Sequence, residues 1–170
     1  TAYGGLNKIE FFNNKVSVKK INLSNKHLKD FNNNLVLFYT GINRKADKIL
    51  SKIINSGNHL KNYEKLSELA KNFENELLLK NFSNCGEILH ENWMLKKNLH
   101  QSVSSLNLDD IYKTALNSGA IGGKLLGAGG GGYFLFIVDP KKKKKLIKNL
   151  SKLNHINFSF QQRGTELIKI

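Results

Sequence analysis

Gly119-Ala120-Ile121-Gly122-Gly123-Lys124-Leu125-Leu126-Gly127-Ala128-Gly129-Gly130-Gly131-Gly132-Tyr133 is the stretch of this 170-residue sequence that decides the fold. Five of the six residues from Gly127 to Gly132 are glycine. Glycine loses more backbone entropy on folding than other residues, so this density predicts positive φ angles, a backbone brought close to a ligand, or both. Successive exposed amides in such a loop form a concavity that holds an anion.

Two common phosphate-binding loops do not fit this stretch. A P-loop places lysine directly after its last glycine and continues into a helix, whereas Lys124 precedes the glycine cluster. The dinucleotide-binding fingerprint also requires a helix after its glycines. Here the apolar run Tyr133–Val138 follows, which predicts a buried strand. The sequence therefore predicts a glycine loop between two strands, and a merely tight hairpin needs fewer glycines.

The elements around this loop predict an α+β fold. Leu35–Thr40 is a short apolar run typical of a buried central strand. Helices are expected over residues 45–55, about 61–80, about 85–99 and from the N-cap Asn107 to Gly119, and a basic helix from Pro140 to about 153. Strands are expected at 158–162 and 166–170. This order predicts an antiparallel sheet with helices packed on one face. In the second helix, a core-facing stripe is expected at Tyr63, Leu66, Ala70, Phe73 and Leu77.

The first 30 residues are expected to belong to a different domain from the rest of the chain. Residues 6–21 predict a β-hairpin around the turn residues Asn13, Asn14 and Lys15, and the polar residues 22–34 predict a connector. A hairpin alone is marginally stable, so we expect it to be the remnant of a preceding N-terminal domain. The predicted domain division is therefore residues 1–30, the end of the N-terminal domain, and residues 31–170, the C-terminal domain. Because the chain starts with Thr1 and its one methionine is Met94, we expect it to be a fragment.

Composition argues against several classes of function. The single cysteine, Cys85, cannot form an internal disulfide and has no partner at metal-ligand spacing, so it is expected to be buried and no metal site is expected. No apolar run is long enough to cross a membrane and no signal peptide is evident, which predicts a soluble, cytoplasmic protein with no membrane partner. The net charge of +14 suggests nucleic acid. However, the lysines are spread over the whole chain and no nucleic-acid-binding motif occurs, so this partner is the weaker alternative.

Arginine is scarce, and its two positions are therefore candidates for binding an anion. Arg44 and Arg163 are the only arginines among 27 basic residues. A guanidinium group binds carboxylate or phosphate through two parallel hydrogen bonds, which lysine cannot imitate. A surface ion pair or a charge at a strand edge is the alternative for both residues, and it is the favoured interpretation for Arg163.

The segment from Gly119 to Gly132 resembles the third motif of the GHMP kinases, the superfamily of galactokinase, homoserine kinase and mevalonate kinase. Residues 3–11, 39–44 and 89–97 are similar to its heptose phosphate kinase branch. The likeness runs in order from Thr1 to about Val138, and afterwards only the layout is similar. The resemblance implies a ferredoxin-like GHMP kinase C-terminal domain, preceded by the hairpin of the N-terminal domain.

The same resemblance implies an activity. That activity is ATP-dependent phosphoryl transfer to the anomeric hydroxyl of D-glycero-D-manno-heptose 7-phosphate, for nucleotide-activated heptose and surface polysaccharide. A GHMP kinase for another sugar or small alcohol, such as galactose or mevalonate, is the alternative. The family's ATP-binding loop, Mg²⁺-binding acidic residue and catalytic aspartate are expected in the missing N-terminal domain. No catalytic residue is therefore matched in this chain, which alone is expected to be inactive.

The resemblance also implies roles for particular residues. The loop Gly127–Gly132 is expected to close on the phosphates, with Lys124 adding positive charge unless it points to solvent. Arg44, which follows Gly41 in the motif, is expected to grip the sugar phosphate. Trp93 is a candidate wall of the sugar pocket, although a position in the core is the favoured interpretation.

Overall fold

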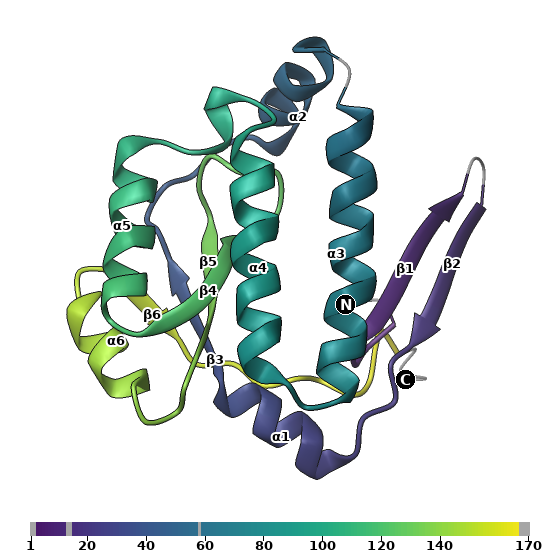
Figure 1. Ribbon diagram of the computed structural model, residues 1–170, viewed down its shortest axis with the longest axis vertical. Coiled ribbons are helices and arrows are strands. Elements are labelled where there is room, and N and C mark those ends of the chain that lie inside the picture. The colour runs from purple at the N-terminus through teal and green to yellow at the C-terminus, as the bar shows by residue number, and fades with distance from the viewer. Residues whose placement is uncertain (1–2, 13–14, 58, 167–170) are drawn as a thin grey trace. The chain divides into compact units, whose positions relative to one another are not determined.

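The computed structural model describes residues 3–12, 15–57 and 59–166, and the chain separates into two compact units (Figure 1). The larger unit consists of residues 33–157. The smaller unit joins the residues up to 32 with those from 158 onward. The sequence-based division placed the boundary after residue 30 and kept all later residues together, whereas in the structure the last segment groups with the first.

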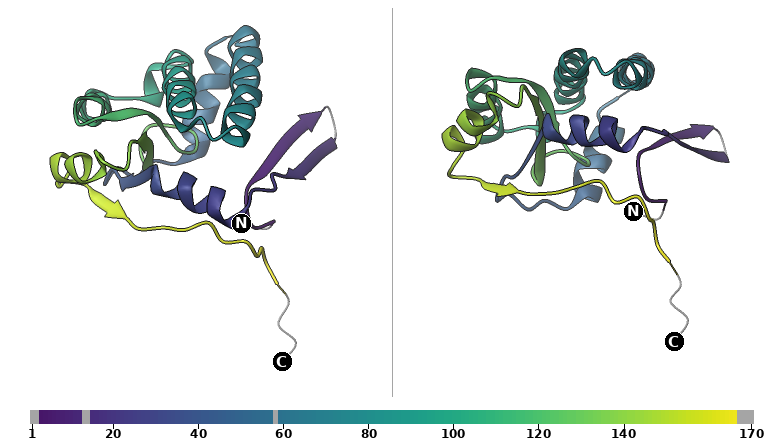
Figure 2. Two further views of the ribbon diagram at one scale, coloured as in Figure 1. Left: turned by 60° about the horizontal axis from the view of Figure 1, so that its bottom comes forward. Right: turned by 90° about the horizontal axis from the view of Figure 1, so that it is seen from below.

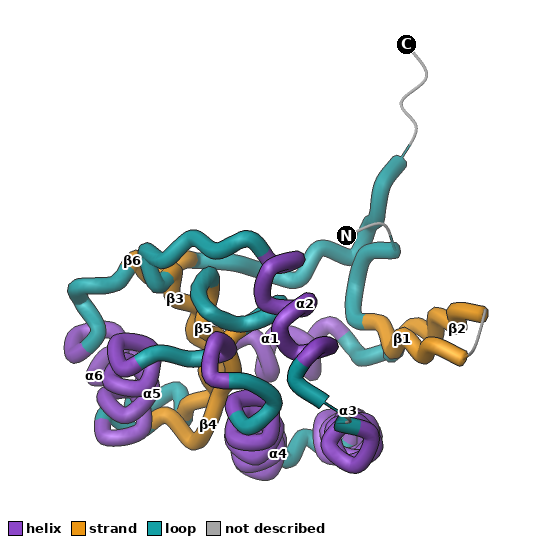
Figure 3. Tube along the Cα trace, turned by 90° about the horizontal axis from the view of Figure 1, so that it is seen from above, coloured by secondary structure: helices purple, strands orange, loops and turns teal. Residues whose placement is uncertain are grey.

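The larger unit contains a four-stranded antiparallel sheet. Its strands are β3 (Leu35–Tyr39), β4 (Ala120–Leu125), β5 (Tyr133–Val138) and β6 (Asn154–Ile156). They lie in the order β4-β5-β3-β6, as Figure 3 shows. In chain order this is second, third, first and fourth, the ferredoxin-like arrangement. The predicted α+β fold with an antiparallel sheet is therefore confirmed, and β3 and β5 are its central strands.

Within its described residues, the larger unit also contains five α-helices, of which α4 and α5 contact the sheet most closely. They are α2 (Ala46–Asn55), α3 (Leu60–Leu78), α4 (Phe82–Lys97), α5 (Leu106–Asn117) and α6 (Lys143–Asn149), with a 3₁₀ turn at Gln101–Val103. α4 packs on β4 and beside α3, and α6 lies next to α5 (Figure 2). The predicted cap at Asn107 is wrong, because the Ser105 hydroxyl accepts the hydrogen bond from the amide of Leu108 at 3.4 Å. The last helix is also shorter than predicted.

Aromatic side chains form the centre of the core. The indole of Trp93 on α4 meets the ring of Phe134 edge-on, with 5.5 Å between ring centroids. Tyr112 on α5 lies 5.7 Å from Phe136. Cys85 is also fully buried, as predicted, and burial raises the pKa of its thiol to about 12. These contacts attach α4 and α5 to the central strands.

Two glycines allow α4 to lie directly on β4. A Cβ atom on Gly122 would collide with the carbonyl of Gly86 and would come within 2.8 Å of the His90 Cβ. Only glycine tolerates a backbone approach this close. The axis of α4 is therefore fixed against the strand that leads into the glycine loop.

The predicted stripe on α3 is only partly correct. Leu77 is buried, and Leu66 and Phe73 are half-buried. Tyr63 and Ala70 are exposed instead, and Leu69, which the stripe omitted, is buried. In the middle of α3, the buried face thus lies about one residue away from the predicted face. Tyr63 is left outside the core and lines a cavity instead.

The smaller unit begins with the predicted hairpin. Strands β1 (Asn7–Phe12) and β2 (Lys15–Lys20) pair antiparallel, while the turn residues Asn13 and Asn14 lie outside the described residues. The predicted connector, residues 22–34, is wrong over most of its length, where the helix α1 (Asn25–Asn33) forms. The Ser24 hydroxyl accepts a hydrogen bond from the amide of His27 at 3.2 Å and so caps this helix.

The predicted strand at 158–162 is also wrong. This segment packs along α1 instead of joining the sheet: the Phe160 ring stacks on Phe31 at 5.8 Å, and the side-chain amide of Asn32 donates to the carbonyl of Phe158 at 3.4 Å. The fourth strand of the sheet is β6, four residues earlier. The strand predicted at 166–170 lies almost entirely outside the described residues, and Glu166 is not in a strand. Within the described ranges, no helix has the length and apolarity that crossing a bilayer requires.

Candidate anion-binding site

The loop between β4 and β5 has the backbone conformation that its glycines predict. All five glycines from 127 to 132 have positive φ angles, between +72° at Gly130 and +155° at Gly131. Strands precede and follow the loop, as predicted. Side chains other than glycine rarely adopt such angles, so this composition fixes a backbone path that no other residue type would follow.

Two amides anchor this loop to neighbouring segments. The amide of Gly130 donates to the carbonyl of Val103 at 2.8 Å, and the amide of Gly132 donates to the carbonyl of Ile42 at 2.9 Å. In return, the carbonyl of Gly132 accepts from both the amide and the hydroxyl of Thr40, each at 2.8 Å. The loop is therefore held in place from two sides.

The remaining amides of the loop have no such partners. Among the described residues, no hydrogen bond is made by the amides of Gly127, Ala128, Gly129 and Gly131. Successive unpaired amides in a short loop can donate together to a phosphate or carboxylate group. The loop thus combines a fixed shape with free donors.

A cavity of about 410 Å³ lies beside the first part of this loop. Gly127 and Ala128 contribute to its wall. Apolar residues of α2 and α3, together with Leu99, form much of the remaining wall. Its polar groups come from Tyr63 on α3, Asn92 and Lys96 on α4, and Lys124 on β4.

The two lysines of the cavity are held by neutral acceptors. The ammonium group of Lys96 donates to the carbonyl of Leu125 at 3.3 Å and to the carbonyl of Gly127. The ammonium group of Lys124 donates to the side-chain oxygen of Asn92 at 2.7 Å. Burial, and then the positive charge of Lys124, lower the pKa of Lys96 to about 8. Burial also lowers the pKa of Lys124.

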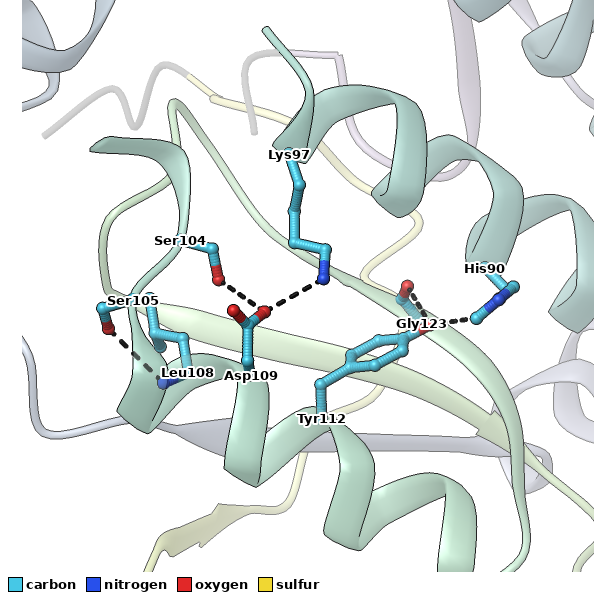
Figure 4. A network of polar contacts seen from close by, with 8 residues as sticks. All are labelled: His90, Lys97, Ser104, Ser105, Leu108, Asp109, Tyr112 and Gly123. Atoms are coloured by element: carbon cyan, nitrogen blue, oxygen red, sulfur yellow. Dashed lines mark hydrogen bonds and ion pairs between the residues drawn. The ribbon is translucent and has the colours of Figure 1, made fainter. Parts of the chain in front are cut away.

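A polar network supports the strand that carries Lys124 (Figure 4). The Tyr112 hydroxyl donates to the carbonyl of Gly123 at 3.2 Å and lies 2.9 Å from Nδ1 of His90. With the hydroxyl proton directed at Gly123, His90 is the donor to Tyr112. Burial raises the pKa of Tyr112 to about 12, which keeps this donor protonated. The network thereby connects α4, α5 and β4.

A second group of contacts holds the segment on which the loop rests. Lys97 pairs with Asp109 at 3.0 Å, and the Ser104 hydroxyl donates to the same carboxylate at 3.0 Å (Figure 4). Ser104 follows Val103, whose carbonyl accepts from Gly130. These contacts position the support of the loop and do not reach the cavity.

The other predicted site residues lie in different surroundings. Arg44 is exposed, and its Cγ lies 3.5 Å from the position of a Cβ atom on Gly130. Gly41 has a φ angle of +74° and an open position. Trp93 has no exposed surface, so its side chain belongs to the core and not to the cavity wall. Arg163 forms an ion pair with Glu166 at 3.8 Å, as the favoured interpretation predicted.

Sequence reasoning missed Lys96, Asn92 and Tyr63. Asn92 and Lys96 are four residues apart on α4 and therefore project from the same side of the helix. This spacing could have indicated that both side chains line one site. The sequence-based prediction named Trp93, the residue beside Asn92, instead. Tyr63 was assigned to the core stripe.

The described residues do not form a metal site by themselves. Residues 3–12, 15–57 and 59–166 contain no group of three or more His, Cys, Asp or Glu side chains that could hold a metal ion. Mg²⁺ prefers carboxylate oxygens and phosphate groups as ligands. The polar groups that the loop and the cavity offer are backbone amides, the hydroxyl of Tyr63, the amide of Asn92 and the ammonium groups of Lys96 and Lys124.

Comparison with known proteins places this chain in a family. Residues 65–156 match the family model described as GHMP kinases C terminal. The chain is 34% identical, over 99% of its length, to a Campylobacter jejuni protein named D-glycero-alpha-D-manno-heptose 7-phosphate kinase, and it covers 51% of that relative.

Solved structures agree with this match. A crystal structure of a sugar kinase from Campylobacter jejuni has a TM-score of 0.70 and 33% identity, over 95% of this chain and 47% of the other. A mevalonate kinase from L. major, in complex with R-mevalonate, has a TM-score of 0.76 over 96% of this chain and 51% of the other; at 21% identity it supports the fold alone. The chain spans about half the length of these relatives.

Proposed function

Because this chain belongs to the GHMP kinase family, we propose that it supplies the C-terminal domain of an ATP-dependent sugar kinase. The proposed acceptor is the anomeric hydroxyl of D-glycero-D-manno-heptose 7-phosphate, since the Campylobacter relative carries that name. The proposed role is a step toward nucleotide-activated heptose for surface polysaccharide. The observation that carries the proposal is the β4–β5 loop, with five positive-φ glycines and four amides that are free among the described residues.

The chemistry of phosphoryl transfer fits these features. The transition state spreads negative charge over the oxygens of the moving phosphoryl group, and fixed hydrogen-bond donors stabilise that charge. ATP supplies this group when it is bound. The free amides of the loop donate to phosphate oxygens, and the anchoring of Gly130 and Gly132 keeps those amides in one geometry. This chain's contribution is therefore to position and to neutralise charge.

Other parts of the reaction are assigned outside the residues described here. We propose that Mg²⁺, the catalytic carboxylate and most ATP contacts belong to an N-terminal domain that partners this one, because the described residues offer no cluster of acidic ligands. We also propose that the protein acts in the cytoplasm, where ATP is available.

The direct test of this function is a substrate panel with the natural full-length protein that contains this chain. With ATP and Mg²⁺, we expect ADP formation with D-glycero-D-manno-heptose 7-phosphate and little with galactose or mevalonate. Phosphate transfer to position 1 is checked by phosphorus NMR of the product. Turnover of galactose or mevalonate with no use of the heptose phosphate would transfer the assignment to another branch of the family.

We predict that Arg44→Lys lowers kcat/KM about tenfold or more in the full-length protein. Arg44 lies beside Gly130 and is proposed to bind the sugar phosphate or another anionic substrate group next to the loop. Lysine keeps the charge but loses the planar pair of donors that a phosphate group accepts from. Steady-state kinetics with the heptose phosphate measure this change.

The matched control is Arg163→Lys, the same substitution at the other arginine. Arg163 is 78% exposed in its side chain and pairs with Glu166 in the smaller unit. We expect its kcat/KM to stay within about twofold of the wild type, since exposed ion pairs contribute little. An equal loss of kcat/KM in both variants would contradict a role of Arg44 in substrate binding.

A further inference from the structure

Lys96 and Lys124 form a pair of positive charges that no acidic side chain within residues 3–12, 15–57 and 59–166 balances. Among the described residues, neither ammonium group has a carboxylate partner; their acceptors are two carbonyls and an amide oxygen. By contrast, the neighbouring lysines Lys65 and Lys97 pair with Glu91 and Asp109. The two lysines of the cavity thus differ from these two neighbours in having only neutral acceptors among the described residues.

This arrangement is unfavourable unless an anion completes it. Two like charges repel one another, and both lose hydration in a cavity whose wall is largely apolar. The positive charge of Lys124 is itself one reason why the pKa of Lys96 falls to about 8. A bound dianion would reverse both effects, because it attracts each ammonium group and replaces lost water.

We propose that Lys96 and Lys124 bind a phosphate group inside this cavity, with the amides of Gly127 and Ala128 as further donors. The volume of about 410 Å³ accommodates a sugar phosphate, which is larger than a free phosphate ion. The side chains of Tyr63, Leu66 and Leu99 offer an apolar surface to the carbon skeleton of such a ligand. Asn92 orients Lys124 toward the ligand.

The position of the cavity relates this inference to the proposed function, on which its assignment to a substrate rests. Arg44 lies beside Gly130, and Lys96 contacts Gly127, so cations flank two different parts of the loop. The proposed reaction uses two molecules that carry phosphate, the nucleotide and the sugar phosphate. Either one can supply the group that binds the lysine pair, and the experiment below distinguishes them.

The test measures binding to the full-length protein by isothermal titration calorimetry, without any turnover. Ligands are D-glycero-D-manno-heptose 7-phosphate, the same heptose without phosphate, and the non-hydrolysable nucleotide AMP-PNP. We expect Lys96→Met and Lys124→Met each to weaken binding of one phosphorylated ligand about tenfold or more, since a hydrogen bond to a charged group is lost. Loss for the sugar phosphate alone identifies the acceptor site, and loss for AMP-PNP alone identifies the nucleotide site.

Lys113→Met is the matched control. Lys113 lies on α5 with an exposed side chain, so its removal changes the net charge equally but leaves the cavity intact. Its affinities are expected to equal those of the wild type. Far-UV circular dichroism confirms folding of each variant, and Lys96→Arg, which keeps the charge, is expected to restore part of the affinity.

A pH series separates the charge of Lys96 from a purely structural role. Among the residues that the structure describes, the titratable groups that line the cavity are Tyr63 on α3, Lys96 on α4 and Lys124 on β4. Neither α2 nor the described loop residues add a titratable group to this lining. Because the pKa of Lys96 is about 8, its ammonium form dominates below that pH and is lost above it. Sulfate, which stays a dianion throughout, is expected to bind more weakly as the pH rises from about 7 to about 9. Lys96→Met is expected to lose most of this dependence.

Two results would overturn the inference. One is wild-type affinity of both Met variants for sulfate and for every phosphorylated ligand. The other is a loss in Lys96→Met without any loss in Lys124→Met, which would mean that Lys96 acts only by holding the carbonyl of Gly127. Neither result depends on catalysis, so failure of the proposed function, seen as no turnover of the heptose phosphate, is recognised separately.

Discussion

Gly129→Ala is expected to lower kcat/KM of the full-length protein about 100-fold while the fold is retained. Gly129 has a φ angle of +111°, and an added Cβ would lie 2.8 Å from Cγ1 of Val103 and 3.0 Å from its carbonyl oxygen. The backbone of Val103 cannot yield, because its carbonyl accepts from Gly130. The loop must therefore move. A displacement of about 1 Å in a group that positions substrate costs roughly 100-fold in rate.

Gly57→Ala provides the comparison for this loop substitution. Gly57 also has a positive φ angle, +130°, but an added Cβ would meet no atom within 4 Å. Both variants carry similar backbone strain, about 1 kcal/mol, so thermal unfolding should shift similarly. Steady-state kinetics should show near wild-type turnover for Gly57→Ala only. If Gly129→Ala were also as active as the wild type, the shape of the loop would not matter to the reaction.

Trp93→Ala is expected to lower the free energy of unfolding by about 3–5 kcal/mol. The indole is completely buried and packs against Phe134, Tyr112 and the cation of Lys97 at 5.9 Å. Removal leaves a cavity between α4 and the central strands. Urea unfolding followed by far-UV circular dichroism measures the loss.

The same variant decides between the two interpretations of Trp93. A core residue affects the amount of folded protein, whereas a wall of the sugar pocket affects KM. We expect the KM for the heptose phosphate to stay unchanged once rates are corrected for the folded fraction. Trp93→Phe, which keeps an aromatic ring, should lose less stability. Unchanged stability together with a raised KM would return Trp93 to the substrate site.

The main elements of the fold were predictable because their signals are local. Apolar runs such as Leu35–Tyr39 and Tyr133–Val138 can be buried strands whatever surrounds them. The dense glycines from 127 to 132 predicted positive φ angles from the same local logic. The resemblance to a family then provided the order in which such elements assemble.

The errors occurred where packing overrides local pattern. The apolar alternation at 158–162 predicted a strand, but this segment finds its partners on α1, through Phe31 and Asn32. In turn, α1 is stabilised by the Ser24 cap and by burial of Phe31, neither of which is evident in a polar, asparagine-rich stretch. Likewise, the interaction between Lys96 and Lys124 could not be predicted from the sequence, because it arises from the packing of α4 on β4.

The single tryptophan allows unfolding of this core to be followed by intrinsic fluorescence. Trp93 is the only indole in the chain, is entirely shielded from water, and its Nε1 hydrogen has no acceptor among the described residues. Such an indole emits at short wavelength when folded and shifts to the red when water reaches it. Its fluorescence therefore reports on residues 33–157 alone, and an unfolding curve that differs from the dichroism curve would reveal that the hairpin unit melts as a separate step.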